Sequence, residues 1–358
     1  MKAILLVGGE GTRLRPLTYD TPKQMLPIVG RPMIERVLEH VAAHGVDEAV
    51  LSLGYLPDAF IRAYPDGVAA GVRLSYAVEP EPYDTAGAVR FAADTVGIEE
   101  TFVVLNGDVL TDMDVSALIE FHRLRGARAT IALHPVEDPS RFGVVQTDEN
   151  GRVEAFIEKP PADEAPTNLI NAGTYVLEPA VLDRISPGRR VSIERETFPA
   201  LVEDGHVFAL ADSSYWLDTG TPLAYLQAHR DLLDGTRGVP PNASAEELDG
   251  NIWTEGDAIV KGTVVGPSYL ARDVRVSGGA TVRGSFLGRC SVVEDGARVV
   301  DSVVLDGAHI AADASVEGSI VGPGATIGQR CSVRPVSVIG GGAILASGTV
   351  LDGARVPE

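Results

Sequence analysis

A glycine-rich segment with two arginines follows the first apolar run of the chain, and it is the first place where chemistry is expected. Residues 3–7 are apolar and lead into Gly8-Gly9-Glu10-Gly11-Thr12-Arg13-Leu14-Arg15-Pro16. Glycines let backbone N–H groups approach phosphate oxygens, and arginines supply positive charge. The spacing fits neither a Walker loop nor a dinucleotide-binding fingerprint, because Leu14 stands where the last glycine of that fingerprint would be. The segment predicts phosphate binding of another kind.

Positive charge is concentrated at this end of an acidic chain. The formal net charge of the 358 residues is −20, whereas residues 1–31 hold five basic and two acidic side chains. A chain this acidic is a poor partner for nucleic acid or an anionic membrane. Lys23 is one of only four lysines in the chain. The local excess of cations therefore predicts a small anionic ligand.

Two aspartates, Asp108 and Asp218, each follow an apolar run that is typical of a strand. Carboxylate oxygens suit a Mg²⁺ ion that also contacts substrate phosphates. Taken alone, such an aspartate is more often a turn residue or a helix cap. Asp112 and Asp114 are better placed to cap the helix that follows, which leaves Asp108 for a metal ion.

Strand-like and helix-like patterns alternate along the chain as far as Asp234. Strands are expected at residues 2–7, 48–53, 72–77 and 101–106, and helices at 34–43, with Pro32 in the first turn, 85–93 and 115–124. This alternation predicts a Rossmann-like α/β domain, with a mixed, mainly parallel sheet covered by helices on both faces. Ligands bind such sheets beyond the carboxyl ends of the strands.

The periodicity changes after a Gly- and Pro-rich stretch near residue 240. Ser285, Ser302, Ser319 and Ser337 recur with sequence separations of 17, 17 and 18, and residues 250–358 hold 19 of the 39 glycines. This spacing predicts a left-handed parallel β-helix of hexapeptide repeats, whereas a small β-sandwich, the alternative, lacks so regular a period. The expected domains are a catalytic domain (1–234), a linker (235–251) and the β-helix (252–358).

The cysteines and the apolar runs bear on location. Cys290 and Cys331 form neither a disulfide framework nor a metal-ligand cluster. The apolar run at residues 3–7 is too short for a signal peptide, and nothing approaches the roughly 20 residues that span a bilayer. A cytoplasmic protein without membrane partners is expected.

Taken together, the motifs closely resemble those of the sugar-1-phosphate nucleotidyltransferase family. The resemblance covers nearly the whole chain and rests on the Gly-rich loop, Pro22-Lys23, Asn106-Gly107-Asp108, Phe142-Gly143, Glu158-Lys159-Pro160, Asn171-Ala172-Gly173 and Trp216-Leu217-Asp218-Thr219-Gly220. Residues 192–199 (SIERETFP) are most similar to the mannose-1-phosphate guanylyltransferase branch. The resemblance implies that GTP and mannose-1-phosphate are converted to GDP-mannose and pyrophosphate.

The resemblance also implies a role for each matching residue. Arg13, Lys23, Asp108 and Asp218 are the expected catalytic residues, and Asp108 and Asp218 hold Mg²⁺. The expected nucleotide-binding residues are Leu6, Gly8, Gly9, Gly11, Thr12, Arg13, Glu79, Gly87, Asn106 and Asp108. The expected sugar-phosphate-binding residues are Gly143, Glu158, Lys159 and Asn171. Subunit contacts through the β-helix, and hence a homo-oligomer, are also expected.

Three alternatives stay open. Residues 23–27 (KQMLP) and 216–221 (WLDTGT) resemble the glucose-1-phosphate thymidylyltransferases, so dTTP or UTP with glucose-1-phosphate is the second substrate pair. A catalytically silent subunit that senses nucleotide sugars could share this fold, although Arg13, Lys23 and both aspartates are intact. A β-helix with acyltransferase activity would use His309, but no other histidine lies in the repeats.

Overall fold

A computed structural model describes residues 1–238 and 240–357. The chain forms two compact units, and each contains two stretches of sequence. Unit 1 comprises Met1–Gly9 and Ile34–Leu217, and unit 2 comprises Glu10–Met33 and Asp218–Glu358. The Gly-rich loop is therefore divided between the units after Gly9. The boundaries predicted at residues 234 and 251 stay a prediction.

Four parallel strands form the middle of the unit 1 sheet. They are β1 (Lys2–Leu6), β4 (Glu48–Leu53), β6 (Val72–Val78) and β7 (Phe102–Asn106), in the order β7-β1-β4-β6. All four agree with the expected strands to within one residue at each end. The near-continuous apolar runs of β1, β4 and β7 reflect burial on both faces of a parallel sheet, whereas β6 alternates between buried and exposed residues.

The rest of this sheet is mainly antiparallel, which makes it mixed, as expected. β12 pairs with β7 and with β10, β11 pairs with β10, and β13 runs parallel to β9. These strands are β5 (Val68–Ala69), β9 (Ala129–Pro135), β10 (Gly143–Thr147), β11 (Val153–Glu158), β12 (Leu169–Leu177) and β13 (Val207–Ala211). β5 closes the opposite edge beside β6.

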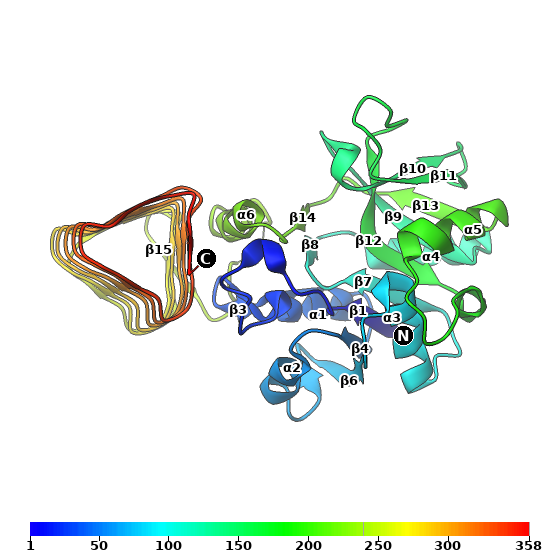
Figure 1. The fold of residues 1–358 in the computed structure, drawn as a ribbon, viewed down its shortest axis with the longest axis horizontal. Coiled ribbons are helices and arrows are strands. Elements are labelled where there is room, and N and C mark those ends of the chain that lie inside the picture. Colours follow the sequence, from blue (N-terminus) through cyan, green and yellow to red (C-terminus); the bar gives the residue numbers. More distant parts are fainter. Residues whose placement is uncertain (239, 358) are drawn as a thin grey trace. The chain divides into compact units, whose positions relative to one another are not determined.

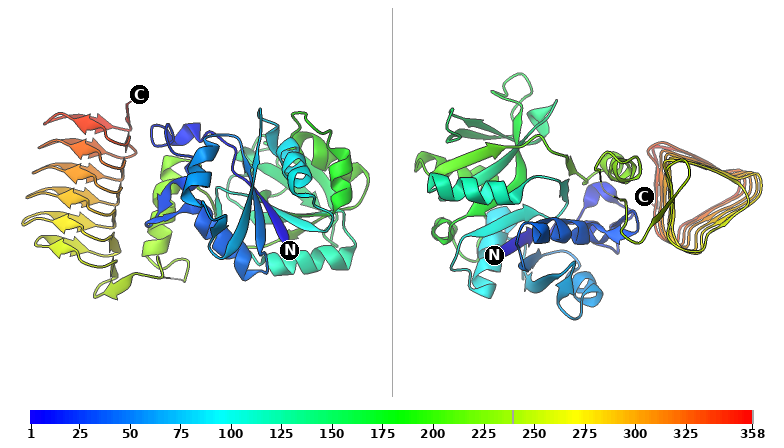
Figure 2. Two further views of the ribbon diagram at one scale, coloured as in Figure 1. Left: turned by 90° about the horizontal axis from the view of Figure 1, so that it is seen from below. Right: turned by 180° about the vertical axis from the view of Figure 1, so that it is seen from behind.

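Helices cover both faces of the sheet (Figures 1 and 2). Up to Leu217 the α-helices are α1 (Met33–Ala43), α2 (Pro57–Ala63), α3 (Asp84–Val96), α4 (Val115–Arg125) and α5 (Phe198–Glu203). Short 3₁₀ turns lie at Pro139–Arg141 and Pro179–Arg184, and a π-helical turn, η5, at Ile193–Thr197. Asp114 caps α4 by accepting the Ala117 N–H, whereas Pro32 lies in a strand before α1 and not in its first turn.

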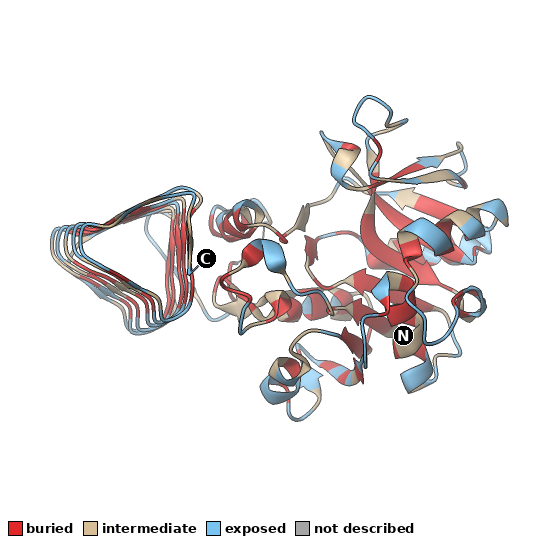
Figure 3. Cartoon of the chain, in the orientation of Figure 1, coloured by how far each residue is buried: buried red, intermediate tan, exposed pale blue. Residues whose placement is uncertain are grey.

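The core of unit 1 lies between the sheet and its helices, and Figure 3 shows the central strands as buried. Ile4, Val104 and Ile131 from the sheet pack with Val89 of α3 and Phe198 of α5, all completely buried. Apolar residues recur every three to four positions in α3, which lets a single helix face meet the sheet. This packing fixes where the strand ends lie.

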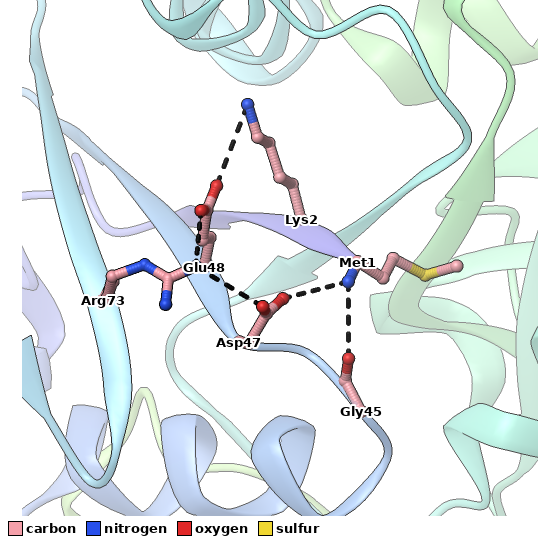
Figure 4. Close-up of polar contacts among 6 residues, drawn as sticks. All are labelled: Met1, Lys2, Gly45, Asp47, Glu48 and Arg73. Atoms are coloured by element: carbon pink, nitrogen blue, oxygen red, sulfur yellow. Dashed lines mark hydrogen bonds and ion pairs between the residues drawn. The ribbon is translucent and has the colours of Figure 1, made fainter.

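Ion pairs cross the amino-terminal edge of the same sheet (Figure 4). Arg73 of β6 contacts Glu48 of β4 at 2.6 Å and Asp47 at 3.4 Å, and Lys2 of β1 lies 3.8 Å from Glu48. The hydrogen bond from Arg73 lowers the pKa of Glu48. These contacts join the amino ends of three neighbouring strands, β1, β4 and β6.

Unit 2 begins with the remainder of the Gly-rich loop. A 3₁₀ turn at Thr12–Leu14 is followed by a second at Lys23–Met25 and by a small hairpin of β2 (Pro27–Ile28) and β3 (Arg31–Pro32). Further along the chain, β14 (Trp216–Asp218) pairs with β8 (Val109–Thr111), and α6 (Pro222–Leu233) follows. Thr221 caps α6 by accepting the Ala224 N–H.

The repeats form a parallel β-helix with three flat sides, seen along its axis in Figure 1 and from the side in Figure 2. The first sheet contains β15 (Glu246–Leu248), β16 (Ile252–Thr254), β19 (Ser268–Leu270), β22 (Phe286–Leu287), β25 (Val303–Val304), β28 (Ile320–Val321), β31 (Val338–Ile339) and β34 (Arg355–Val356). The second contains β17 (Ile259–Val260), β20 (Arg275–Val276), β23 (Val292–Val293), β26 (His309–Ile310), β29 (Thr326–Ile327) and β32 (Ile344–Leu345). The third contains β18 (Thr263–Val265), β21 (Thr281–Arg283), β24 (Arg298–Val300), β27 (Ser315–Glu317), β30 (Ser332–Arg334) and β33 (Val350–Asp352). This is the repeat architecture that the serine spacing predicts; β15, within the expected linker, pairs antiparallel with β16.

The repeating serines stack inside the β-helix, and the structure adds Ser268 to the expected set. The hydroxyl of Ser285 accepts the N–H of Ser302, and that of Ser302 accepts the N–H of Ser319. Where the spacing lengthens before Ser337, the N–H of that serine bonds to Arg334 instead. The regular spacing of the earlier serines therefore keeps buried hydroxyls within reach of the next coil.

Within residues 1–238 and 240–357, no helix combines the length and apolar character needed to cross a bilayer.

Candidate active site

The carboxyl ends of three parallel strands meet at one level. Leu6 of β1 is in register with Ser52 of β4 and with Asn106 of β7. The N–H of Gly107 donates to the Leu6 carbonyl at 3.0 Å. The predicted nucleotide-binding residues Leu6 and Asn106 are therefore brought together at the edge where parallel sheets bind ligands.

Gly8 follows this edge and passes close to another backbone segment. A Cβ atom added to Gly8 would lie 3.2 Å from the Gly54 nitrogen and 3.5 Å from Oε1 of Glu79. Any larger residue at position 8 would press on both. Gly8 is half-buried and Gly9 is exposed, so the loop turns outward from the strand end. This geometry suits backbone contact with a ligand.

In unit 2, Gly11 lets the loop pack against Lys23. Gly11 has φ +62°, and a Cβ atom there would lie 3.0 Å from Cβ of Lys23 and 3.1 Å from Cγ2 of Thr18. The Thr18 hydroxyl donates to the Gly11 carbonyl at 2.9 Å. The left-handed conformation and the close approach both favour glycine. Lys23 and the turn that carries Thr12 and Arg13 are thereby held next to each other.

Arg13 and Asp218 face each other in unit 2. Nη2 of Arg13 lies 3.9 Å from Oδ2 of Asp218, and the Gly220 N–H donates to Oδ1 at 2.8 Å. A Cβ atom on Gly220 would lie 2.5 Å from Nη2 of Arg13. Gly220 therefore leaves the space that the guanidinium occupies. Two predicted catalytic residues from distant parts of the sequence are thus neighbours.

Glu79 is tied into the protein at both carboxylate oxygens. Oε1 accepts the Ser52 hydroxyl at 3.0 Å, and Oε2 accepts the Tyr83 N–H at 2.9 Å. These bonds join the end of β4 to the loop that precedes α3. Each carboxylate oxygen has a second lone pair for a further donor. Glu79 is therefore a half-buried, oriented acceptor beside Gly8.

Gly87 has a packing role that the sequence did not predict. Its N–H donates to the Val191 carbonyl at 3.1 Å. A Cβ atom there would lie 2.5 Å from the Arg189 carbonyl oxygen and 2.9 Å from Cβ of Tyr83. Residues 189–191 cross the first turn of α3 at this point. The expected contact with nucleotide stays a prediction, but the N–H of Gly87 already has a protein partner.

Thr85 and Glu194 form a connection that motif reasoning missed. The Thr85 hydroxyl donates to Oε2 of Glu194 at 2.7 Å and accepts the Ile193 N–H at 2.8 Å. Ser192 donates to the same Oε2 at 2.9 Å. The π-helical turn η5 is thereby attached to the start of α3 and to the Glu79 loop. The available signal was the resemblance of residues 192–199, which include Glu194, to the mannose-1-phosphate guanylyltransferase branch.

The Asn171-Ala172-Gly173 motif forms a β-bulge in β12. The register of β12 against β9 shifts between Asn171 and Tyr175. Gly173 has φ +76°, and a Cβ atom there would lie 2.5 Å from Nδ2 of Asn106. The Asn171 side chain accepts the Gly173 N–H at 3.0 Å and donates to the Tyr175 hydroxyl at 2.8 Å. The bulge thus places Asn171 and Asn106 around one glycine.

Gly143, Glu158 and Lys159 are brought together by the β10–β11 pair. Gly143 is opposite Glu158, and a Cβ atom on it would lie 2.7 Å from the Phe156 ring. Nζ of Lys159 lies 3.2 Å from Oε1 of Glu158. Lys159 has φ +51°, which is uncommon for a residue with a side chain and often marks a functional site. Its side chain is 56% exposed, so the ammonium group is accessible to a ligand.

Trp216 is a further residue that the sequence analysis did not single out. Its indole N–H donates to the Ala172 carbonyl at 2.9 Å. The ring stacks on His134 at 5.4 Å and meets Phe142 edge-on at 5.5 Å. It therefore joins the β12 bulge to the start of β10. Its position two residues before Asp218 was the available signal.

Asp108 is half-buried in the short connection between β7 and β8. Since Asp114 caps α4, Asp108 is not needed for that cap. The predicted site residues fall in both units: Arg13, Lys23 and Asp218 in unit 2, and Asp108 with the sugar-phosphate-binding set in unit 1.

The comparisons with known proteins place both parts of the chain. A family profile described as "Nucleotidyl transferase" matches residues 2–235, and one described as "GMPPB C-terminal domain" matches residues 256–357. The chain belongs to the nucleotidyl transferase family. The resemblance drawn from the motifs and the expected fold class are both confirmed.

Curated relatives carry a more specific name. The chain is 41% identical over 312 residues to "Mannose-1-phosphate guanylyltransferase" from Mycobacterium tuberculosis, covering 85% of this chain and 82% of that protein. It is 38% identical to "Probable mannose-1-phosphate guanylyltransferase 2" from Oryza sativa subsp. japonica, covering 95% and 91%. Among solved structures, HddC from Yersinia pseudotuberculosis matches with a TM-score of 0.56 and 29% identity. That match covers 64% of this chain and 98% of HddC, which has also been solved with GMP-PN.

Proposed function

We propose that this protein transfers a guanylyl group from GTP to mannose-1-phosphate. A phosphate oxygen of the sugar phosphate attacks the α-phosphorus of GTP, the bond to the β-phosphate breaks, and GDP-mannose and pyrophosphate are released. The observation that carries the proposal is the match to proteins named for this activity along 85–95% of the chain. Arg13, Lys23, Asp108 and Asp218 are all present.

The reaction needs no general base. A phosphate monoester has a second pKa of about 6, so the attacking oxygen is already ionised at neutral pH. The barrier comes from bringing two anions together and from the charge that develops on the leaving pyrophosphate. Catalysis therefore depends on positioning and on fixed positive charge.

Arg13 and Lys23 supply that positive charge. Gly11 holds the backbone of the turn against Lys23, and Asp218 and Gly220 orient the guanidinium of Arg13. A guanidinium fork matches phosphate oxygens in two places, whereas an ammonium acts as a compact point charge. We assign Arg13 and Lys23 to the triphosphate and to the charge that leaves with pyrophosphate.

The donor set is compatible with Mg²⁺ if substrate phosphates complete the coordination. Within residues 1–238 and 240–357, no group of three or more His, Cys, Asp or Glu side chains forms an all-protein metal site. Mg²⁺ usually takes one or two carboxylates and fills its remaining positions with phosphates and water. We assign Asp108 and Asp218 to hold it. When bound, the ion withdraws charge from the phosphates that it contacts.

Lys159, Glu158 and Asn171 are assigned to the sugar phosphate. The exposed ammonium of Lys159 attracts the phosphate, and its contact with Glu158 limits the directions in which it can point. Asn171 is oriented by its bonds to Gly173 and Tyr175. Glutamate and asparagine side chains accept or donate hydrogen bonds to sugar hydroxyls.

One assay tests the function and separates it from the alternatives. Four nucleoside triphosphates are each incubated with mannose-1-phosphate or glucose-1-phosphate, and pyrophosphate release is measured with Mg²⁺ or with EDTA. We expect the highest kcat/KM for GTP with mannose-1-phosphate and no turnover in EDTA. Preference for dTTP or UTP with glucose-1-phosphate favours the second substrate pair. Nucleotide-sugar binding without turnover identifies a sensing subunit.

An acyltransferase role for the β-helix is not part of the proposal. Nε2 of His309 lies 2.8 Å from Oε1 of Glu294, so a surface hydrogen bond accounts for the position of the ring. We assign to the β-helix a structural role and the subunit contacts of a homo-oligomer. We expect the reaction to take place in the cytoplasm.

A further inference from the structure

The Gly-rich loop from Glu10 onward belongs to the same compact unit as the β-helix. Residues 10–33, which carry Arg13 and Lys23, group with residues 218–358 and not with the parallel sheet. The loop is therefore in contact with a domain that has no residue in the predicted site.

The first contact joins Pro16 to the β-helix. A Cβ atom added to Gly340 would lie 3.0 Å from Cγ and 3.1 Å from Cβ of Pro16, and 3.2 Å from the Val356 carbonyl oxygen of the next coil. Gly340 directly follows β31, at a corner of the coil. The ring of Pro16 thus occupies the space where any other residue at position 340 would carry its side chain.

The position of Pro16 is transmitted to Arg13 by successive tight turns. The Leu14 N–H donates to Gly11, the Arg15 N–H to Thr12, and the Leu17 N–H to Leu14, at 2.9–3.2 Å. A backbone held by overlapping turns moves as one piece, because each bond spans the start of the next. Displacing Pro16 therefore displaces the guanidinium of Arg13, three residues away.

The second contact is aromatic and supports the Lys23 side of the segment. The Tyr225 hydroxyl of α6 donates to the Pro27 carbonyl, and a Cβ on Gly30 would lie 4.0 Å from the Phe286 ring. The His229 ring lies between Tyr225 and Phe286, at 4.7 and 5.3 Å from them. Tyr225 and Phe286 are completely or almost completely buried. The hairpin after Lys23 therefore rests on α6 and the β-helix.

We propose that the β-helix positions Arg13 and Lys23, with Gly340 as a positioning residue that acts on Arg13 through Pro16. This inference rests on the proposed function for its kinetic consequences. It makes a testable distinction: disturbing the Gly340 contact impairs the use of nucleotide, whereas an equal disturbance elsewhere in the same coils does not.

Gly340→Ala and Gly328→Ala provide the matched pair. A Cβ on Gly328 would lie 2.5 Å from the Leu345 carbonyl oxygen, so this control also strains the last coils, but against other β-helix residues. We expect Gly340→Ala to lower kcat/KM for GTP by about tenfold or more, since small misplacements of catalytic groups have large effects. KM for mannose-1-phosphate stays within twofold, and Gly328→Ala stays near wild type for both substrates.

Pro16→Ala tests the same contact from the other side. Pro16→Ala removes Cγ, the nearer of the two crowding atoms, and keeps Cβ, so Pro16→Ala combined with Gly340→Ala recovers part of the activity lost in Gly340→Ala. If Gly340→Ala does not fold, Pro16→Ala alone carries the test, with a reduced kcat/KM for GTP as the expected result. Thermal unfolding of every variant separates misfolding from mispositioning.

Hydrogen exchange gives a readout that does not depend on activity. We expect faster amide exchange in peptides from residues 10–33 in Gly340→Ala but not in Gly328→Ala. The inference is overturned if both variants change exchange and kinetics alike, or if Gly340→Ala impairs both substrates equally. Failure of the proposed function would instead appear as an inactive wild type, with the exchange difference still present.

Discussion

The guanidinium Nη2 of Arg13 lies 3.9 Å from Oδ2 of Asp218, while the Gly220 N–H holds Oδ1 of the same carboxylate at 2.8 Å. Asp218 thus faces the main cation of the loop and is itself held in place by the backbone. A carboxylate in this position orients Arg13, and the proposed function also assigns it to a divalent ion. Replacing Asp218 should therefore affect both the orientation of Arg13 and the binding of the divalent ion.

Asp108→Ala and Asp218→Ala are each expected to lower turnover by about 10²–10³ or more, because each removes a group that stabilises charge in the transition state. The measurement is steady-state pyrophosphate release at saturating GTP and mannose-1-phosphate. Asp112→Ala is the control, since Asp112 is not assigned to metal. Turnover within tenfold of wild type in either variant would rule out its assignment to the metal.

Lys159→Ala should raise KM for mannose-1-phosphate far more than KM for GTP. The lysine ammonium is exposed beside Glu158 and is assigned to the sugar phosphate, so its loss weakens one substrate selectively. Initial rates measured at varied concentrations of each substrate give the two KM values. Lys261→Ala, a change in a β-helix lysine, serves as control. Equal increases in both KM values would contradict the assignment.

Glu79→Gln should reduce discrimination between GTP and inosine triphosphate. Glu79 is an oriented hydrogen-bond acceptor. A carboxylate beside the base would accept a hydrogen bond from the 2-amino group of guanine, which the base of inosine triphosphate lacks. The ratio of kcat/KM for the two nucleotides is the measurement. Glu81→Gln, in the exposed part of the same loop, is the control. An unchanged ratio in Glu79→Gln would show that Glu79 serves only to hold the loop.

Gly87→Ala should destabilise the protein by about 1–3 kcal/mol, the usual cost of overpacking. The added methyl group would lie 2.5 Å from the Arg189 carbonyl oxygen, which belongs to a backbone that cannot yield easily. Urea unfolding followed by circular dichroism gives the free energy of unfolding. Ala88→Gly, at the next helical position, controls for helix propensity. Wild-type stability of Gly87→Ala would contradict the packing role.

Stability should fall as the pH is lowered from 7.5 to 5.5, and His122 should contribute. Burial lowers the pKa of His122 below its ordinary 6.5, against the opposing contact with Glu178. The unfolded chain then binds the proton more tightly than the folded one, so stability is lost as the pH falls through 6.5. Urea unfolding at both pH values should show a smaller loss in His122→Asn. An identical loss would exclude His122 as a contributor.

Local patterns were sufficient for much of the fold. Apolar runs identified β1, β4 and β7 to within one residue, because burial on both faces leaves few other arrangements for such runs, and the alternating pattern of residues 72–77 identified β6. The regular serine spacing predicted the β-helix, since each buried hydroxyl must meet the backbone of the next coil. The break in that spacing at Ser337 coincides with a changed hydrogen bond. The motifs identified the family because each of them is a short run of neighbouring residues that can be compared directly between sequences.

Relations between distant residues required the tertiary structure. The motif around Asp218 predicted a metal ligand. Only the fold showed that its carboxylate faces Arg13 and accepts a hydrogen bond from the Gly220 N–H. The contact of Gly87 with nucleotide stays a prediction, and only the fold showed that the Arg189 carbonyl approaches Gly87 and gives it a packing role. The sequence by itself determined which residue types are available and which elements carry them. Contacts between residues that are distant in the sequence depend on how those elements pack, and no local pattern encodes the distance between two such residues.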